Sequence, residues 1–97
     1  MKKTEYLDPI RGEEFVPILE DLVKSAEAFV FKQFKALAEE IFMLPRDYDA
    51  IGQLLAQGYH REARRKNFRA VKAYAAAQDY MTDRRIAMTP YWGRFLA

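Results

Sequence analysis

Histidine is the side chain that most often transfers protons near neutral pH, and this 97-residue sequence contains one, His60. Its nearest carboxylate along the chain is Glu62, and a spacing of two places helical side chains on different faces. Ser25 is the only serine, and no general base stands at a characteristic sequence spacing from it. The sequence contains no cysteine. A nucleophile activated by a neighbouring base is not indicated, so we predict that the protein is not an enzyme.

Patterns that would hold a metal ion or a phosphate group are not found either. Metal sites in helical bundles use Glu-x-x-His pairs or repeated histidines, and neither pattern occurs. The four glycines do not form a phosphate-binding loop. The acid pairs Glu20-Asp21 and Glu39-Glu40 are typical of solvated helix faces. We therefore expect no metal and no cofactor.

The strongest local signal is the basic segment from His60 to Lys72, which contains six lysines and arginines and one glutamate. On a helix, five of these cations fall within about 140° of arc, with an aromatic residue in their middle. Clustered cations around an aromatic side chain are typical of binding surfaces. The predicted basic face consists of Arg61, Arg64, Arg65, Phe68, Arg69 and Lys72.

Three interpretations of this face remain open. It could be a solvated face that balances acidic residues elsewhere in the chain, because residues 1–50 carry seven basic and eleven acidic residues while residues 51–97 carry nine and three. It could receive an acidic protein surface, with Phe68 as an anchor. It could contact nucleic-acid phosphates, although the net charge of +2 is low for a dedicated nucleic-acid binder.

The elements that must position these residues are all predicted to be helices, since no stretch alternates apolar and polar residues over five positions. The first runs from Pro17, which suits a first helical turn, to Leu44, where Pro45 stops it. Its 28 residues would span about 42 Å, more than the roughly 32 Å diameter of a compact chain of this size, so we expect an elongated molecule. Its predicted core-facing residues are Ile18, Leu19, Leu22, Val23, Ala26, Phe29, Val30, Phe34, Leu37, Ile41 and Leu44.

Two further helices are expected after Pro45. A short one spans about 48–57, with Asp47 as N-cap and Gly58 as the residue that ends it. A long basic one runs from about 59 to 81, or to 88 before Thr89-Pro90 ends it. Alanine recurs at every seventh position of this helix, and a second row of residues with the same spacing lies beside it. This heptad spacing predicts a seam that packs in the core. The seam consists of Ala63, Asn67, Ala70, Tyr74, Ala77 and Met81.

Two other aromatic groups are candidate partner-binding surfaces. Phe31 and Phe42 are eleven residues apart and so share a stripe opposite the core-facing arc of the first helix. Either another helix covers this stripe, or it forms a second interface, of which a homodimer is one form. The aromatic C-terminal tail, 89–97, includes Trp92, which either closes the end of the bundle or anchors a partner.

These patterns predict one all-α domain over residues 1–97: a small elongated three-helix bundle with an irregular lead-in, 1–14, and an aromatic tail. We predict a non-catalytic protein-interaction module, such as an adaptor, inhibitor or regulatory subunit, that binds an acidic protein. A nucleic-acid-binding protein and a structural homo-oligomer are the alternatives. No apolar run follows Lys2-Lys3 and none could span a bilayer, so we expect no signal peptide, no membrane partner and a cytoplasmic location.

Overall fold

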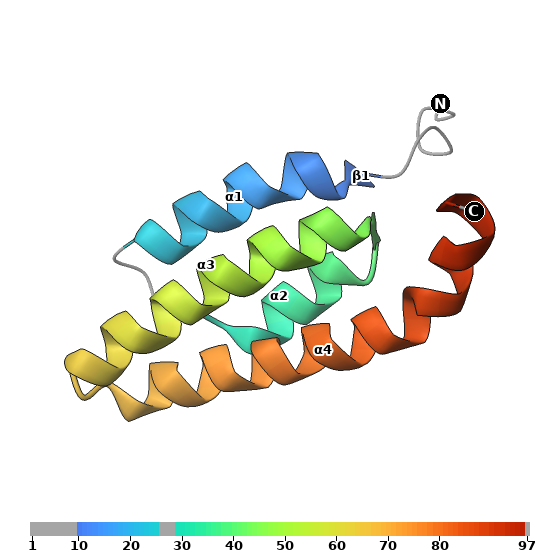
Figure 1. The fold of residues 1–97 in the computed structure, drawn as a ribbon. Coiled ribbons are helices and arrows are strands. Elements are labelled where there is room, and N and C mark those ends of the chain that lie inside the picture. The colour runs from blue at the N-terminus through green and yellow to red at the C-terminus, as the bar shows by residue number, and fades with distance from the viewer. Residues whose placement is uncertain (1–9, 26–28, 97) are drawn as a thin grey trace.

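The computed structural model describes residues 10–25 and 29–96 and is dominated by helices (Figure 1). In the described residues the chain forms four helices, which are α1 (Gly12–Lys24), α2 (Phe31–Ala38), α3 (Pro45–Arg64) and α4 (Phe68–Leu96). Two-residue strands, β1 (Ile10–Arg11) and β2 (Ile41–Phe42), pair in parallel, with Ile10 opposite Ile41. The all-α class is thus confirmed, and the predicted number of three helices is wrong.

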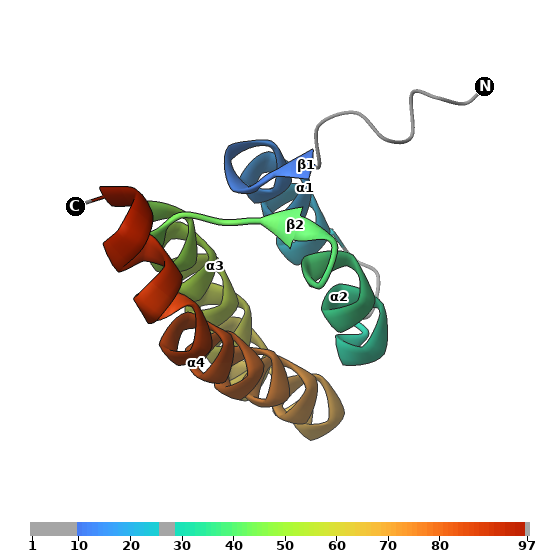
Figure 2. The same ribbon diagram turned by 90° about the vertical axis from the view of Figure 1, so that its right-hand side faces the viewer.

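The helices form two layers (Figure 2). α3 and α4 make a hairpin, α1 packs on α3, and α2 packs on α4. The molecule measures 42 × 35 × 18 Å, so it is a slab and not the rod that one long helix would give. No helix in the described part of the chain has the length and apolar character needed to cross a membrane.

The predicted helix 17–44 is wrong, because the chain breaks it into α1, α2 and β2. The helix begins earlier, at Gly12, and contains Pro17 in its interior. Ser25 and Val30 both have extended backbone, with ψ angles of 154° and 112°. Two short helices bury Phe15 and Phe34 in one core, with ring centroids 6.0 Å apart, whereas a straight helix would carry them away from each other. Residues 26–28 of the predicted helix, and residues 1–9 of the predicted lead-in, lie outside the described residues.

The predicted helix 48–57 is present, but its predicted end at Gly58 is wrong, since α3 spans Pro45–Arg64. Pro45 occupies the first turn of α3, where a missing N–H is tolerated. Asp47 is not the N-cap but the third helical residue, and its Oδ2 accepts a hydrogen bond of 2.8 Å from the backbone N–H of Leu44. Gly58 is buried against Tyr74 of α4, so its small size serves helix packing.

The predicted tail 89–97 is helical through Leu96, because α4 continues beyond Thr89-Pro90. Proline removes one backbone hydrogen bond and bends a helix, and α4 changes direction near its C-terminal end (Figure 1). This bend places Trp92 in the core, where it is 5% exposed and contacts Tyr48 edge-on at 5.2 Å between ring centroids. The Trp92 Nε1–H donates a 3.1 Å hydrogen bond to the carbonyl of Met43.

The core lies between the two layers and is rich in aromatic rings. Phe29, in the segment that breaks the predicted first helix, stacks on Tyr74 at a centroid distance of 4.2 Å. The predicted seam is confirmed from Ala70 onward, while Ala63 and Asn67 precede α4 and are not buried. The buried seam residues are Ala70, Tyr74, Ala77 and Met81.

Candidate functional site

The basic segment forms the turn between α3 and α4, at one end of the molecule (Figure 1). The prediction of a single basic helix face is therefore wrong, because α3 ends at Arg64 and α4 begins at Phe68. The cations are nevertheless gathered at one place, since both helix ends lie there. We call this surface the basic tip; it consists of Arg64, Arg65, Lys66, Phe68, Arg69 and Lys72.

A tight C-terminal motif of α3 shapes the tip. The backbone N–H of Lys66 donates a hydrogen bond of 3.0 Å to the backbone carbonyl of Ala63. The backbone N–H of Asn67 donates one of 2.9 Å to the backbone carbonyl of Glu62. This is the Schellman arrangement, in which the residue after the C-cap takes the left-handed conformation. Lys66 is that residue, with a φ angle of 60°. Glycine is the usual occupant, so the chain keeps a cation here at a conformational cost.

Arg61 is the member of the predicted basic face that points into the protein. Its guanidinium donates hydrogen bonds to the carbonyl of Val23, to Oε2 of Glu62 at 2.7 Å and to the Tyr74 hydroxyl at 3.4 Å. The Val23 carbonyl belongs to the last turn of α1, whose carbonyls have no partner within that helix. Arg61 therefore ties α1 to α3 and α4, and we leave it out of the basic tip.

Glu62 is the buried acid beneath the tip, with 6% of its surface exposed. Its carboxylate also accepts a 3.3 Å hydrogen bond from the Asn67 side chain, which holds the turn. The hydrogen bond from Arg61 is the main reason that the pKa of Glu62 lies below its usual value of 4.5, and burial opposes this shift. Glu62 is thus a charged structural group at neutral pH.

The outer surface of the tip is exposed and positive. Phe68 is 67% exposed, and the first turn of α4 contains no acid. Arg65 lies 3.6 Å from Glu62, but its own side chain is 65% exposed. Among the described residues no carboxylate forms an ion pair with the other tip cations, and the N-terminus of α4 adds its own positive potential. Those cations are Arg64, Lys66, Arg69 and Lys72.

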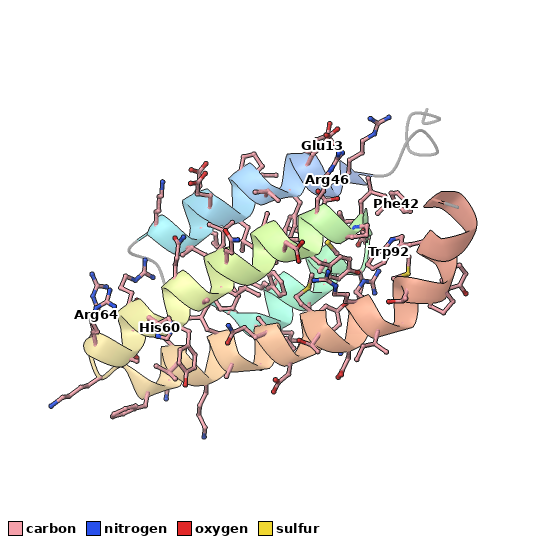
Figure 3. All side chains as sticks on the ribbon, in the orientation of Figure 1. Glu13, Phe42, Arg46, His60, Arg64 and Trp92 are labelled. Carbon is pink, nitrogen blue, oxygen red and sulfur yellow. The ribbon has the colours of Figure 1, made fainter. Side chains whose placement is uncertain are left out.

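Three predicted site residues lie away from the tip, and two of them are neighbours, because Trp92 donates its hydrogen bond to Met43, the residue next to Phe42 (Figure 3). Phe31 is half-buried and meets the edge of Tyr80, with ring centroids 6.2 Å apart. Phe42 lies on β2 and is 42% exposed. The two no longer form a stripe, because the chain between them is not one helix. Trp92 packs in the core, which matches the interpretation that it closes the end of the bundle.

Polar side chains line two hollows at opposite ends of α3. Figure 3 shows His60 and Arg64 near one end of α3, where they line a hollow of about 460 Å³ together with Lys24 and Gln57. At the other end Glu13 and Arg46, labelled in the same figure, form an ion pair of 3.7 Å beside a cavity of about 330 Å³. In both places polar side chains connect α1 to α3 or lie in solvent.

The sequence interpretation missed an exposed apolar groove between α1 and α2. Residues assigned to the core-facing arc of one long helix instead line a hollow of about 470 Å³, which α1 and α2 both border. The signal that could have found it is the excess of apolar positions over what one buried face needs. The exposed apolar residues are Ile18, Leu22, Val30 and Leu37.

A function is not identified by a metal-binding cluster in the described residues or by similarity to known proteins. No group of three or more histidine, aspartate or glutamate side chains that could hold a metal ion occurs within residues 10–25 and 29–96. No family model, curated protein or solved structure matches the chain. The absence of enzyme activity stays a prediction. The basic tip and the groove are two exposed surfaces of the described structure, one with clustered cations and one with clustered apolar side chains.

Proposed function

We propose that this protein is a non-catalytic interaction module that binds an acidic, partly apolar protein surface through the basic tip. The observation that carries the proposal is the 67% exposure of Phe68 among the tip cations, four of which form no ion pair with a carboxylate of the described residues. Arginine and aromatic side chains dominate binding energy at interfaces, where an aromatic ring fills a pocket and charges surround it. An adaptor, an inhibitor or a regulatory subunit would all use such a surface.

The rigidity of the tip supports a binding role. The Arg61–Glu62–Asn67 contacts and the Schellman turn hold the backbone beneath the exposed side chains. A surface that is already in its bound shape loses less conformational entropy when a partner arrives. Lys66 supports the same role, because it adds a positive charge at a position where glycine would be more stable.

A nucleic-acid partner is the second candidate. An exposed aromatic ring among cations also suits a base stacked on Phe68 with phosphates beside Arg65 and Arg69. The weaker point is the acidic first half of the chain, which leaves a net charge of +2. A cytoplasmic location stays a prediction in both cases.

Site-specific photocrosslinking tests the protein partner directly. A photoreactive phenylalanine analogue replaces Phe68 in cells that naturally make the chain, and crosslinked products are identified by mass spectrometry. The matched control places the same analogue at Ile86, which is equally exposed at 67% on the same helix but far from the tip. We expect a defined protein adduct from position 68 and none from position 86. Equal labelling at both positions, or none, would overturn the proposal.

A binding titration separates the nucleic-acid candidate. Wild-type chain and the Arg65→Glu variant are titrated with single-stranded and duplex DNA and with RNA at two salt concentrations. Five phosphate contacts would give a slope of roughly −4 to −5 for the logarithm of the binding constant against the logarithm of salt concentration on duplex DNA. Absence of binding at low salt would reject the nucleic-acid candidate and leave the protein partner.

A further inference from the structure

The groove between α1 and α2 is an apolar surface that the monomer leaves uncovered. Ile18 is 53% exposed and Val30 is 43% exposed, while Leu22 and Leu37 are each 37% exposed. They lie together along one hollow, above the buried rings of Phe15 and Phe34. Large apolar side chains gathered in one place on a small protein indicate a binding site.

The described lining of this groove carries one charge, and that charge is negative. Asp21 lines it, and the remaining polar lining residues, Ser25 and Gln33, are uncharged. Glu14 is four positions before Ile18 on α1, so the two share one side of the helix. No lysine or arginine is among the described lining residues. The groove therefore fits an apolar group that carries positive charge around it.

The basic tip has this complementary chemistry. Phe68 is an exposed apolar group, and Arg65, Arg69 and Lys72 surround it with positive charge. We propose that the groove binds the basic tip of a second copy of this chain, with Phe68 against Ile18 and Leu22 and an arginine beside Asp21. This inference rests on the proposed function, because it names the partner of the same tip.

The contact must form between two molecules. The tip lies at the far end of the α3–α4 hairpin and projects past the end of α1, whereas the groove lies within the other layer (Figures 1 and 2). A tip-to-tip dimer would bring two positive surfaces together, which like-charge repulsion disfavours. A groove-to-groove dimer would leave the exposed ring of Phe68 uncovered. The remaining arrangement is head-to-tail, in which the tip of each molecule binds the groove of the next. Such a contact extends into a filament or closes into a ring.

A mixing experiment tests the head-to-tail contact. Phe68→Glu removes the apolar side chain of the tip and leaves the groove intact. Ile18→Lys places a positive charge in the groove and leaves the tip intact. Each substitution changes an exposed side chain, and circular dichroism checks that each variant remains folded. We expect wild-type chain to associate reversibly, less at high salt, and each variant alone to associate about 30-fold more weakly. A one-to-one mixture should form a heterodimer of twice 11.4 kDa, because one intact tip meets one intact groove.

Sedimentation over a wide concentration range measures these masses, and Ile86→Lys serves as a control at an exposed site outside both surfaces. A wild-type chain that stays monomeric, a Phe68→Glu variant that associates as tightly as wild type, or a mixture without heterodimer would overturn the inference. If one of these occurs while position 68 crosslinks to a different protein, the proposed function stands and this inference fails. If position 68 captures no protein at all, both fail.

Discussion

The backbone of Gly58 on α3 lies directly against the ring of Tyr74 on α4. A Cβ atom on Gly58 would lie 2.3 Å from Cε1 and Cζ of this ring, closer than non-bonded atoms approach. Tyr74 is 1% exposed and stacked on Phe29, so its ring has no free space to move into. The absence of a side chain at position 58 therefore sets how closely the two halves of the hairpin approach.

Gly58→Ala should lower the free energy of unfolding by about 1–3 kcal/mol, because the added methyl group overpacks the α3–α4 contact. Gly52→Ala is the matched control on the same helix, where no atom lies within 4 Å of an added Cβ. That control should stabilise the protein by about 0.5–1 kcal/mol through backbone entropy. Urea unfolding followed by circular dichroism measures both, and effects of the same sign would contradict the packing argument.

Trp92→Phe should lower the free energy of unfolding by about 1–3 kcal/mol, since it keeps an aromatic ring but removes the donor to the Met43 carbonyl. The neighbouring substitution Tyr91→Phe changes a side chain that is 53% exposed, and it should have an effect within about 0.5 kcal/mol. Thermal unfolding by circular dichroism compares the two. Similar losses in both variants would mean that the Trp92 hydrogen bond does not matter.

Glu62 should make stability depend on pH. Its pKa in the folded protein lies below the usual 4.5, chiefly because of the Arg61 hydrogen bond, so its stabilising effect is complete above pH 4.5. This effect is lost as pH falls through the lowered pKa. Glu62→Gln should therefore cost about 2 kcal/mol at neutral pH, and its difference from wild type should shrink at low pH. A pH-independent difference, measured by urea unfolding, would be inconsistent with this assignment.

Arg61 and Arg64 should behave differently although they lie on the same turn of the same helix. Arg61→Ala should cost about 2–3 kcal/mol, because it leaves Glu62 buried without its main partner. Arg64→Ala should change stability by no more than about 0.5 kcal/mol and should weaken partner binding at the tip. Equal stability losses in the two variants would show that burial does not separate their roles.

Lys66→Gly should raise the free energy of unfolding by about 1 kcal/mol, since glycine takes the left-handed conformation without strain. The same change removes one positive charge from the tip and should weaken association with an acidic partner. A variant that is both more stable and a weaker binder is the expected result. Loss of stability would argue that the Lys66 side chain makes a contact that holds the turn.

The helical class, the buried seam from Ala70 to Met81 and the cluster of cations around Phe68 could be predicted from the sequence alone. Each of these depends on residue types and on spacing within a few turns, which the chain carries locally. The sequence could not distinguish Arg61 from Arg64, because both are arginines in one basic segment. Only the approach of α1 places a carbonyl beside Arg61 and leaves Arg64 in solvent.

The position at which the long apolar segment breaks depends on contacts between distant parts of the chain. Continuous helical spacing between Pro17 and Leu44 favours one helix, but Phe15 and Phe34 bury themselves together only if the chain turns back. The same packing decided the role of Gly58, which depends on the ring opposite it, and left Ile18 and Leu22 in a groove. Periodicity reports which face of a helix is apolar, whereas contacts between distant segments decide which part of that face is covered.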